Sequence, residues 1–180
     1  MLNVGLTGGI ACGKTTVAEM LVARGAHLID FDALAHEVEA PDRPAWRGIV
    51  SAFGEGVLNA DRTIDRPKLG AIVFEDKAKL ETLNGIVHPA VFDEWRQRMD
   101  AIMHNDPRSI ILSDVPLLFE VGMAPLFDLV ALVYVSPAQQ VERLMKRNGF
   151  TAEEARARLA AQMSIDEKVR LADVVIDNQG

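Results

Sequence analysis

The sequence predicts an α/β fold, in which a parallel sheet of about five strands is flanked by helices. Five short apolar runs are spread along the 180 residues, and several are apolar on both faces, as strands covered by helices on both sides are. Helix patterns lie between these runs, and such alternation is typical of a parallel sheet. The predicted strands are Leu2–Leu6, Ala26–Ile29, Ser109–Leu112, Leu129–Val135 and Asp173–Ile176.

The first two predicted strands are joined by a short helix. A glycine-rich turn leads from the first strand into a predicted helix over Thr15–Arg24, which has an apolar face and ends before Gly25. About 80 residues then separate the second strand from the third, although a crossover needs only about a dozen. This insertion, roughly residues 31–107, contains several helix patterns and both tryptophans. It is predicted to be a mostly helical subdomain on the substrate side.

A second helical insertion follows the fourth strand, over about residues 137–171. Pro137 suits the first turn of a helix over Pro137–Arg147, and Thr151 with Glu154 forms a capping-box pattern before a helix over Thr151–Gln162. The segment is rich in Lys and Arg, and it is predicted to be a lid. We therefore expect a single domain, with a core of about residues 1–30, 108–136 and 172–180.

Composition narrows the class of protein. The chain has 19 Lys and Arg against 26 Asp and Glu, a formal net charge of −7. An acidic chain lacks the general basic face that nucleic acids or an anionic membrane require, so we expect neither as a partner. No apolar stretch approaches the ~20 residues of a membrane span, and the first residues lack the basic start of a signal peptide. The single cysteine, Cys12, excludes an internal disulfide and fits a reducing, cytoplasmic compartment.

The glycine-rich turn carries a phosphate-binding motif. Residues 8–15, GGIACGKT, fit G-x-x-x-x-G-K-[ST] and lie between a strand and a helix, as that motif requires. Glycines let backbone amides surround a phosphate, and the helix N-terminus adds positive potential. Lys14 can reach the β- and γ-phosphates, and the Thr15 hydroxyl can bind Mg²⁺. The predicted nucleotide-binding residues are Gly9, Ile10, Ala11, Cys12 (through its backbone), Gly13, Lys14, Thr15 and Thr16.

Acidic residues follow two of the predicted strands. Asp30 and Asp32 come after the second strand and Asp114 after the third, at the strand ends where ligands of open α/β sheets bind. A carboxylate there can accept a proton from an attacking hydroxyl or hold Mg²⁺ through water. Asp32 is the candidate base, and its alternative role is to cap the helix that follows it. Asp114 is either a second Mg²⁺ anchor or a turn residue.

Two further features concern basic side chains. Arg143 and Arg147 are four residues apart, so one helix face presents both. That face is either solvated or part of a lid that neutralises the transferring phosphoryl group. His88, before Pro89 and between helix patterns, is expected to be structural, because no second His at ligand spacing supports a metal site.

Over essentially its whole length, the sequence resembles the dephospho-CoA kinase family. The motifs that carry the resemblance are LTGGIACGKTTVA, IDFDALAHEV, DRPKLGAIVF with LNGIVHPAV, DVPLLFE, the lid segment from VYVSPAQQ to ARLAAQ, and ADVVIDNQG. The resemblance implies that ATP, with Mg²⁺, phosphorylates the ribose 3′-hydroxyl of dephospho-CoA to give CoA and ADP. It also implies a P-loop NTPase-type core with a helical CoA-side subdomain and a lid.

The resemblance also implies roles for individual residues. Asp32 matches the general base, Lys14 the phosphate lysine and Thr15 the Mg²⁺ ligand, while Arg143 and Arg147 match the lid arginines. Family members usually have Ser or Gly where Cys12 stands, and they usually continue with one more helix beyond the position of Gly180. The remaining matched positions are Arg66, His88, Leu117, Leu118 and Glu120 on the acceptor side and Asn178 near the adenine.

Two alternatives remain open at this point. A kinase of another small molecule, such as a nucleoside monophosphate, would share the phosphate loop, the insertion and the lid, and only DVPLLFE and LNGIVHP argue against it. A non-catalytic, GTPase-like switch fits less well, because the guanine-reading N-K-x-D motif is absent from the sequence. The sequence is equally compatible with a monomer and with a weak homo-oligomer.

Overall fold

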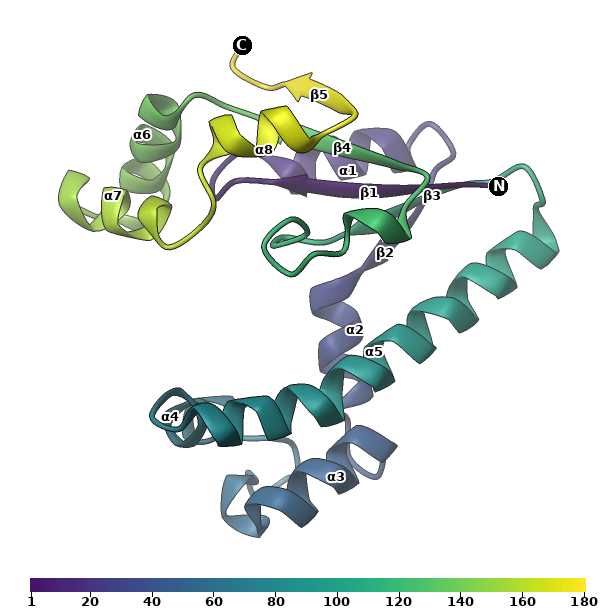
Figure 1. Ribbon diagram of the computed structural model, residues 1–180, viewed down its shortest axis with the longest axis vertical. Coiled ribbons are helices and arrows are strands. Elements are labelled where there is room, and N and C mark those ends of the chain that lie inside the picture. The colour runs from purple at the N-terminus through teal and green to yellow at the C-terminus, as the bar shows by residue number, and fades with distance from the viewer. The chain divides into compact units, whose positions relative to one another are not determined.

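The structure is a computed structural model that describes all residues, 1–180, and it divides into two compact units. The first unit comprises Met1–Asp30 and Ile102–Gly180, and the second comprises Phe31–Ala101. The sheet belongs to the first unit, whereas the second unit consists of helices and their connections (Figure 1).

The first unit is built on a five-stranded parallel sheet in the order β2-β3-β1-β4-β5 (Figure 1). Because the strands are parallel, their carboxyl ends meet at one edge. β1 is central and the chain order reverses beside it, so the turn after β1 lies where ligands bind in such sheets. All five predicted strands are confirmed, with small shifts at their ends: β1 Leu2–Gly8, β2 His27–Asp30, β3 Ile110–Asp114, β4 Leu129–Tyr134 and β5 Val174–Asp177.

Four helices complete the first unit: α1 Lys14–Val22, α6 Pro137–Asn148, α7 Ala152–Ala160 and α8 Ile165–Leu171. The capping box predicted at Thr151 is confirmed, since Thr151 and Glu154 bond each other's backbone amides at the start of α7. Ser164 and Glu167 form a second box at the start of α8. The Thr151 amide lowers the pKa of Glu154. These boxes satisfy amides that would otherwise lack partners, and so fix where α7 and α8 begin.

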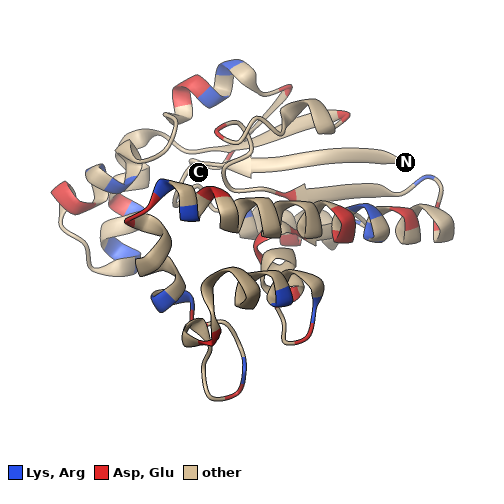
Figure 2. Cartoon of the chain, turned by 60° about the horizontal axis from the view of Figure 1, so that its bottom comes forward, with Lys and Arg blue, Asp and Glu red and all other residues tan.

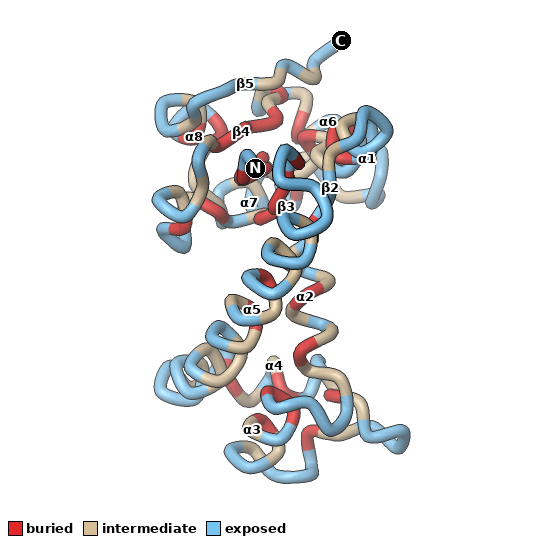
Figure 3. The backbone as a smooth tube through the Cα atoms, turned by 90° about the vertical axis from the view of Figure 1, so that its right-hand side faces the viewer, coloured by how far each residue is buried: buried red, intermediate tan, exposed pale blue.

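Apolar side chains from β1, β3 and β4 form the core of the first unit. Leu6, Leu132 and Val133 are fully buried, and α1 adds Val17 and Ala18 to the same cluster. β4 is buried along most of its length, whereas β5 at the sheet edge is largely exposed (Figure 3). Charged residues lie mainly on helices and loops, and the strands are nearly free of charge (Figure 2). This distribution explains the two-sided apolar runs of the sequence.

The second unit has its own core. Its helices are α2 Phe31–Val38, α3 Pro44–Phe53, α4 Arg66–Phe74 and α5 Lys77–Asn105, the last of which continues into the first unit. Trp46 and Ile49 of α3 pack with Leu69 and Val73 of α4 in an apolar cluster that α5 also contacts. Trp46 is anchored further, because its indole Nε1 donates to the Arg62 carbonyl at 2.8 Å.

The structure corrects two expectations in this unit. α2 begins at Phe31, so Asp32 lies inside its first turn and does not cap it. His88 and Pro89 lie inside α5 rather than between helices. A proline removes one amide donor and usually ends a helix, but here the helix continues for 16 residues beyond Pro89, to Asn105.

No helix of the chain combines the length and the apolar character that crossing a membrane requires.

Candidate active site

The phosphate-binding motif forms a turn of alternating backbone handedness between β1 and α1. Ala11 (φ 61°) and Gly13 (φ 80°) are both left-handed, on either side of Cys12. Such alternation is typical of turns whose amides face an anion, although here the Ile10 amide donates to Gln162 and the Cys12 amide to the Gly9 carbonyl. α1 begins directly after Gly13, at Lys14, and the first amides of a helix have no acceptor within it. The turn and the helix start together have the backbone geometry that suits an anion-binding site.

Two glycines of this turn lie against side-chain amides from other segments. A Cβ on Gly13 would collide with the side-chain amide of Asn178, and its positive φ already disfavours other residues. A Cβ on Gly9 would collide with the side-chain amide of Gln140. The turn is therefore enclosed by α6, which carries Gln140, and by the segment after β5, which carries Asn178.

Lys14 forms an ion pair with Asp114 at the carboxyl end of β3. Both side chains are largely buried, with exposed fractions of 18% and 9%. Asp114 pairs in register with Leu6 of β1 and Asp30 of β2, so it stands at the same sheet edge as the phosphate loop. The role that the sequence left open for Asp114 is thus, in part, to hold the lysine ammonium at that edge.

Cys12 is buried inside the loop, with 1% exposure. Burial raises the pKa of its thiol, which keeps the sulfur protonated and unreactive near neutral pH. Its backbone carbonyl accepts a hydrogen bond from Asn178 Nδ2 at 2.8 Å, and its Sγ lies 3.3 Å from Gln140 Nε2. Cys12 therefore contributes packing and backbone geometry rather than thiol chemistry.

The basic residues of α6 lie beside the loop. Arg143 donates through Nη2 to the Asn178 carbonyl at 2.8 Å. Arg147 is exposed, and its Nε donates to the side chain of the next residue, Asn148, at 2.9 Å. A cavity of about 430 Å³ is lined by Ala11, Gly13, Arg143, Lys146 and Arg147. The structure thus brings together the loop, both predicted lid arginines and Asn178.

The segment after β3, which the resemblance assigns to the acceptor side, has one exposed residue and two with structural contacts. Leu117 is exposed (40%), whereas Leu118 is fully buried and packs under Gly5 of β1. Glu120 accepts the backbone amide of Met163 at 3.1 Å and forms an ion pair with Lys168 at 2.7 Å. Leu118 therefore serves the core, and Glu120 ties this segment to α8 and to Met163 in the connection that precedes α8.

Thr15 and Thr16 are exposed in the first turn of α1, and the other three predicted residues belong to the second unit. Asp32 is exposed in the first turn of α2, two residues after the end of β2. Arg66 begins α4 and forms an ion pair with Glu39 at 2.6 Å, and burial raises the pKa of Glu39. His88 is exposed on α5.

Sequence reasoning missed three residues of the segment 137–171: Gln140 and Gln162, which bond the loop, and Lys168, which pairs with Glu120. Gln140 is 3% exposed, and Lys168 is fully buried. Gln162 accepts the backbone amide of Ile10 at 3.2 Å. The sequence gives little signal for them, because Gln and Lys on a helix usually lie on its solvated face. Only the repeated polar contacts in the structure reveal their positions.

A central parallel strand that leads into GxxxxGKT, with the basic helix α6 beside the loop, is typical of a P-loop kinase. The comparisons with known proteins are more specific. The dephospho-CoA kinase family profile matches residues 2–180. The chain belongs to the dephospho-CoA kinase family.

Individual relatives agree with this assignment. The chain is 56% identical over 180 residues to a dephospho-CoA kinase of Syntrophus aciditrophicus, covering all of the chain and 77% of that protein. It is 49% identical to one from Streptomyces avermitilis, covering 99% of the chain and 85% of that protein. Its fold is similar to the dephospho-CoA kinase structure from Campylobacter jejuni, with a TM-score of 0.72, 29% identity and coverage of 99% and 88%.

Proposed function

We propose that the protein transfers the γ-phosphoryl group of ATP to the ribose 3′-hydroxyl of dephospho-CoA, giving CoA and ADP. The observation that carries this proposal is the match of the family profile over residues 2–180. The assembly of the phosphate loop, Lys14, Arg143 and Arg147 in one unit supports it, because phosphoryl transfer depends on positioned positive charge around the phosphates. The single buried cysteine is compatible with the reducing cytoplasm that we propose as its location.

On the donor side, the loop amides and the start of α1 bind the ATP phosphates. Lys14 already stands at this edge in its ion pair with Asp114, and it contacts the β- and γ-phosphates when ATP is bound. Arg143 and Arg147 line the adjoining cavity and neutralise charge on the transferring group. Asn178 hydrogen-bonds both Cys12 of the loop and Arg143 of α6, and so holds the two segments together beside the nucleotide.

The oxygen atoms available at this edge of the sheet are of the kind that binds Mg²⁺. Thr15 offers a hydroxyl in the first turn of α1, and Asp114 offers a carboxylate at the end of β3. Hard oxygen ligands of this kind suit Mg²⁺, which keeps most of its waters and otherwise binds substrate phosphates. When bound, the ion supplies charge neutralisation of the β- and γ-phosphates.

On the acceptor side, Asp32 accepts the proton of the attacking 3′-hydroxyl. Arg66, whose guanidinium is exposed and balanced by Glu39, binds the acceptor's pyrophosphate, since Arg matches phosphate oxygens bidentately. Within the second unit, the exposed side chain of His88 is a further acceptor contact. Within the first unit, Leu117 offers an exposed apolar contact, and Leu118 and Glu120 act indirectly by fixing the segment that carries it. The active protein is a monomer or a weak homo-oligomer.

A direct test of this function is acceptor-dependent release of ADP. The protein is incubated with ATP·Mg²⁺ alone and with dephospho-CoA, and ADP is measured over time. Rapid release only with the acceptor is expected for a kinase. A rate that is the same with and without acceptor would indicate a nucleotide-hydrolysing switch and would contradict the proposal.

Arg147→Ala is expected to lower kcat/KM by about 10-fold or more with little change in melting temperature. Its guanidinium is exposed, and an exposed arginine contributes little to folding, whereas a charge that meets the transferring phosphoryl group stabilises the transition state. Steady-state kinetics and thermal unfolding measure the two effects. Arg108→Ala, an exposed arginine before β3, is the matched control. Equal activity of the two variants would place Arg147 on a solvated face.

A further inference from the structure

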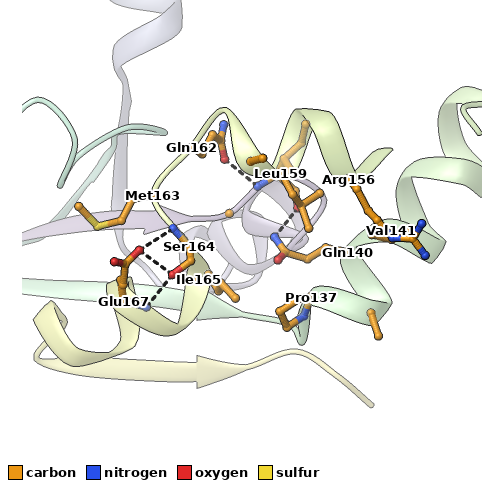
Figure 4. A pocket seen from close by; sticks show the side chains of 14 residues that line it. Pro137, Gln140, Val141, Arg156, Leu159, Gln162, Met163, Ser164, Ile165 and Glu167 are labelled. Carbon is orange, nitrogen blue, oxygen red and sulfur yellow. Dashed lines mark hydrogen bonds between the residues drawn. The ribbon is translucent and has the colours of Figure 1, made fainter. Parts of the chain in front are cut away.

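The link between α7 and α8, residues 161–164, contacts the phosphate loop. Gln162 Oε1 accepts a hydrogen bond from the Ile10 amide at 3.2 Å, and Gln140 Nε2 of α6 donates to the Ile10 carbonyl at 2.8 Å. Figure 4 shows both glutamines, which line a cavity of about 780 Å³, with their hydrogen bonds to the loop. Both backbone polar groups of Ile10 are thus held by side chains of the lid.

The same link is anchored on its other side. The amide of Met163, next to Gln162, donates to Glu120 Oε1 at 3.1 Å. Lys168 of α8 is completely buried, and its ammonium forms an ion pair with Glu120 at 2.7 Å. This ammonium makes no hydrogen bond, so the carboxylate of Glu120 is the group that compensates for its lost hydration. The Glu120–Lys168 pair therefore fixes the link, and with it the place from which Gln162 reaches the loop.

We propose that Gln162 is a positioning residue for the phosphate loop, placed for this task by the Glu120–Lys168 ion pair. The inference rests on the proposed function for the ATP site. A glycine-rich loop samples many conformations. The apparent affinity for nucleotide falls when a smaller fraction of the protein molecules has the loop in the conformation that binds it. By holding the Ile10 amide, Gln162 raises that fraction, while the amides at the start of α1 stay available for phosphate.

A blocking role for Gln162 and a positioning role predict opposite changes in nucleotide affinity when the side chain is removed. If Gln162 occupied an amide that the nucleotide needs, its removal would tighten nucleotide binding. If Gln162 positions the loop, its removal weakens nucleotide binding and leaves acceptor binding unchanged. A residue important only for folding would lower the melting temperature without a selective effect on either ligand.

The test is Gln162→Met, which keeps the side-chain length but removes the accepting oxygen. Titration calorimetry with ADP·Mg²⁺ is expected to give a Kd roughly three- to tenfold higher, the range for one lost neutral hydrogen bond, with an unchanged Kd for dephospho-CoA. Gln97→Met, at an exposed glutamine of α5, is the matched control. Unchanged or tighter ADP binding by Gln162→Met would overturn the inference. A different result, no ADP binding by the wild-type protein, would contradict the proposed function itself.

The anchor is tested by a pair of variants. Glu120→Gln leaves the buried Lys168 ammonium without its counter-charge, so ADP affinity and melting temperature are expected to fall together. Glu120→Gln combined with Lys168→Met removes both charges, so the melting temperature is expected to recover, whereas ADP affinity stays low because the link has lost its anchor. Wild-type ADP affinity in the double variant would overturn the role of the ion pair as an anchor.

Discussion

Lys14→Ala is expected to lower turnover by about 10²-fold or more, which is the loss typical of one charged transition-state contact. The lysine lies directly after Gly13, at the start of α1 and beside the strand edge where the loop amides converge. Without it, ATP can still contact the amides, but charge that develops on the transferring group loses its main protein counter-charge. Steady-state kinetics with saturating ATP measure the effect.

The ion pair with Asp114 complicates this variant, because Lys14→Ala leaves a largely buried carboxylate without its counter-charge. Lys14→Met combined with Asp114→Asn removes both charges and separates stability from catalysis. We expect this double variant to melt close to the wild type and to remain as inactive as Lys14→Ala. Turnover near the wild-type value in either variant would contradict the assignment of the phosphate loop.

Asp32→Asn is expected to cause the second large loss, a fall in kcat of about 10²-fold or more, because a positioned base typically contributes that much. The substitution keeps the shape of the side chain and removes only its charge and basicity. ATP binding is expected to stay within about twofold, since the phosphate loop belongs to the other unit of the chain. Single-turnover kinetics and ADP titration measure the two effects.

Stability provides the control for Asp32. The carboxylate lies in the first turn of α2, where a negative charge favours the helix by only about 0.3–1 kcal/mol. The Asn variant should therefore melt within a few degrees of the wild type. An unchanged kcat with a lower melting temperature would show that Asp32 serves the helix start alone.

The parts of the fold that the sequence predicts well are those fixed by local patterns. The strand β1, the GxxxxGKT turn and α1 are consecutive, so their chemistry and geometry follow from neighbouring residues. The capping box at Thr151 is equally local, and it is found as expected. Strands β3 and β4 are recognisable because a buried parallel strand is apolar on both faces.

The parts that the sequence does not predict depend on tertiary contacts. Pro89 suggests a break in the helix pattern, yet α5 passes through it. Lys168 and Gln140 belong to residue types that are usually exposed, and both are buried because Glu120, Ile10 and Cys12 supply partners from distant parts of the chain. The Lys14–Asp114 pair likewise depends on β3 lying next to β1.

The most direct measurement is the identity of the phosphorylated product. The protein is incubated with ATP·Mg²⁺ and either dephospho-CoA or AMP, and the products are identified by mass and phosphorus NMR, with Lys14→Ala as the control for contaminating kinases. We expect dephospho-CoA to gain one phosphate as a 3′-monoester and AMP to react much more slowly, because remote parts of dephospho-CoA contribute to transition-state binding. Faster conversion of AMP to ADP than of dephospho-CoA to CoA would contradict this function and indicate a nucleoside monophosphate kinase.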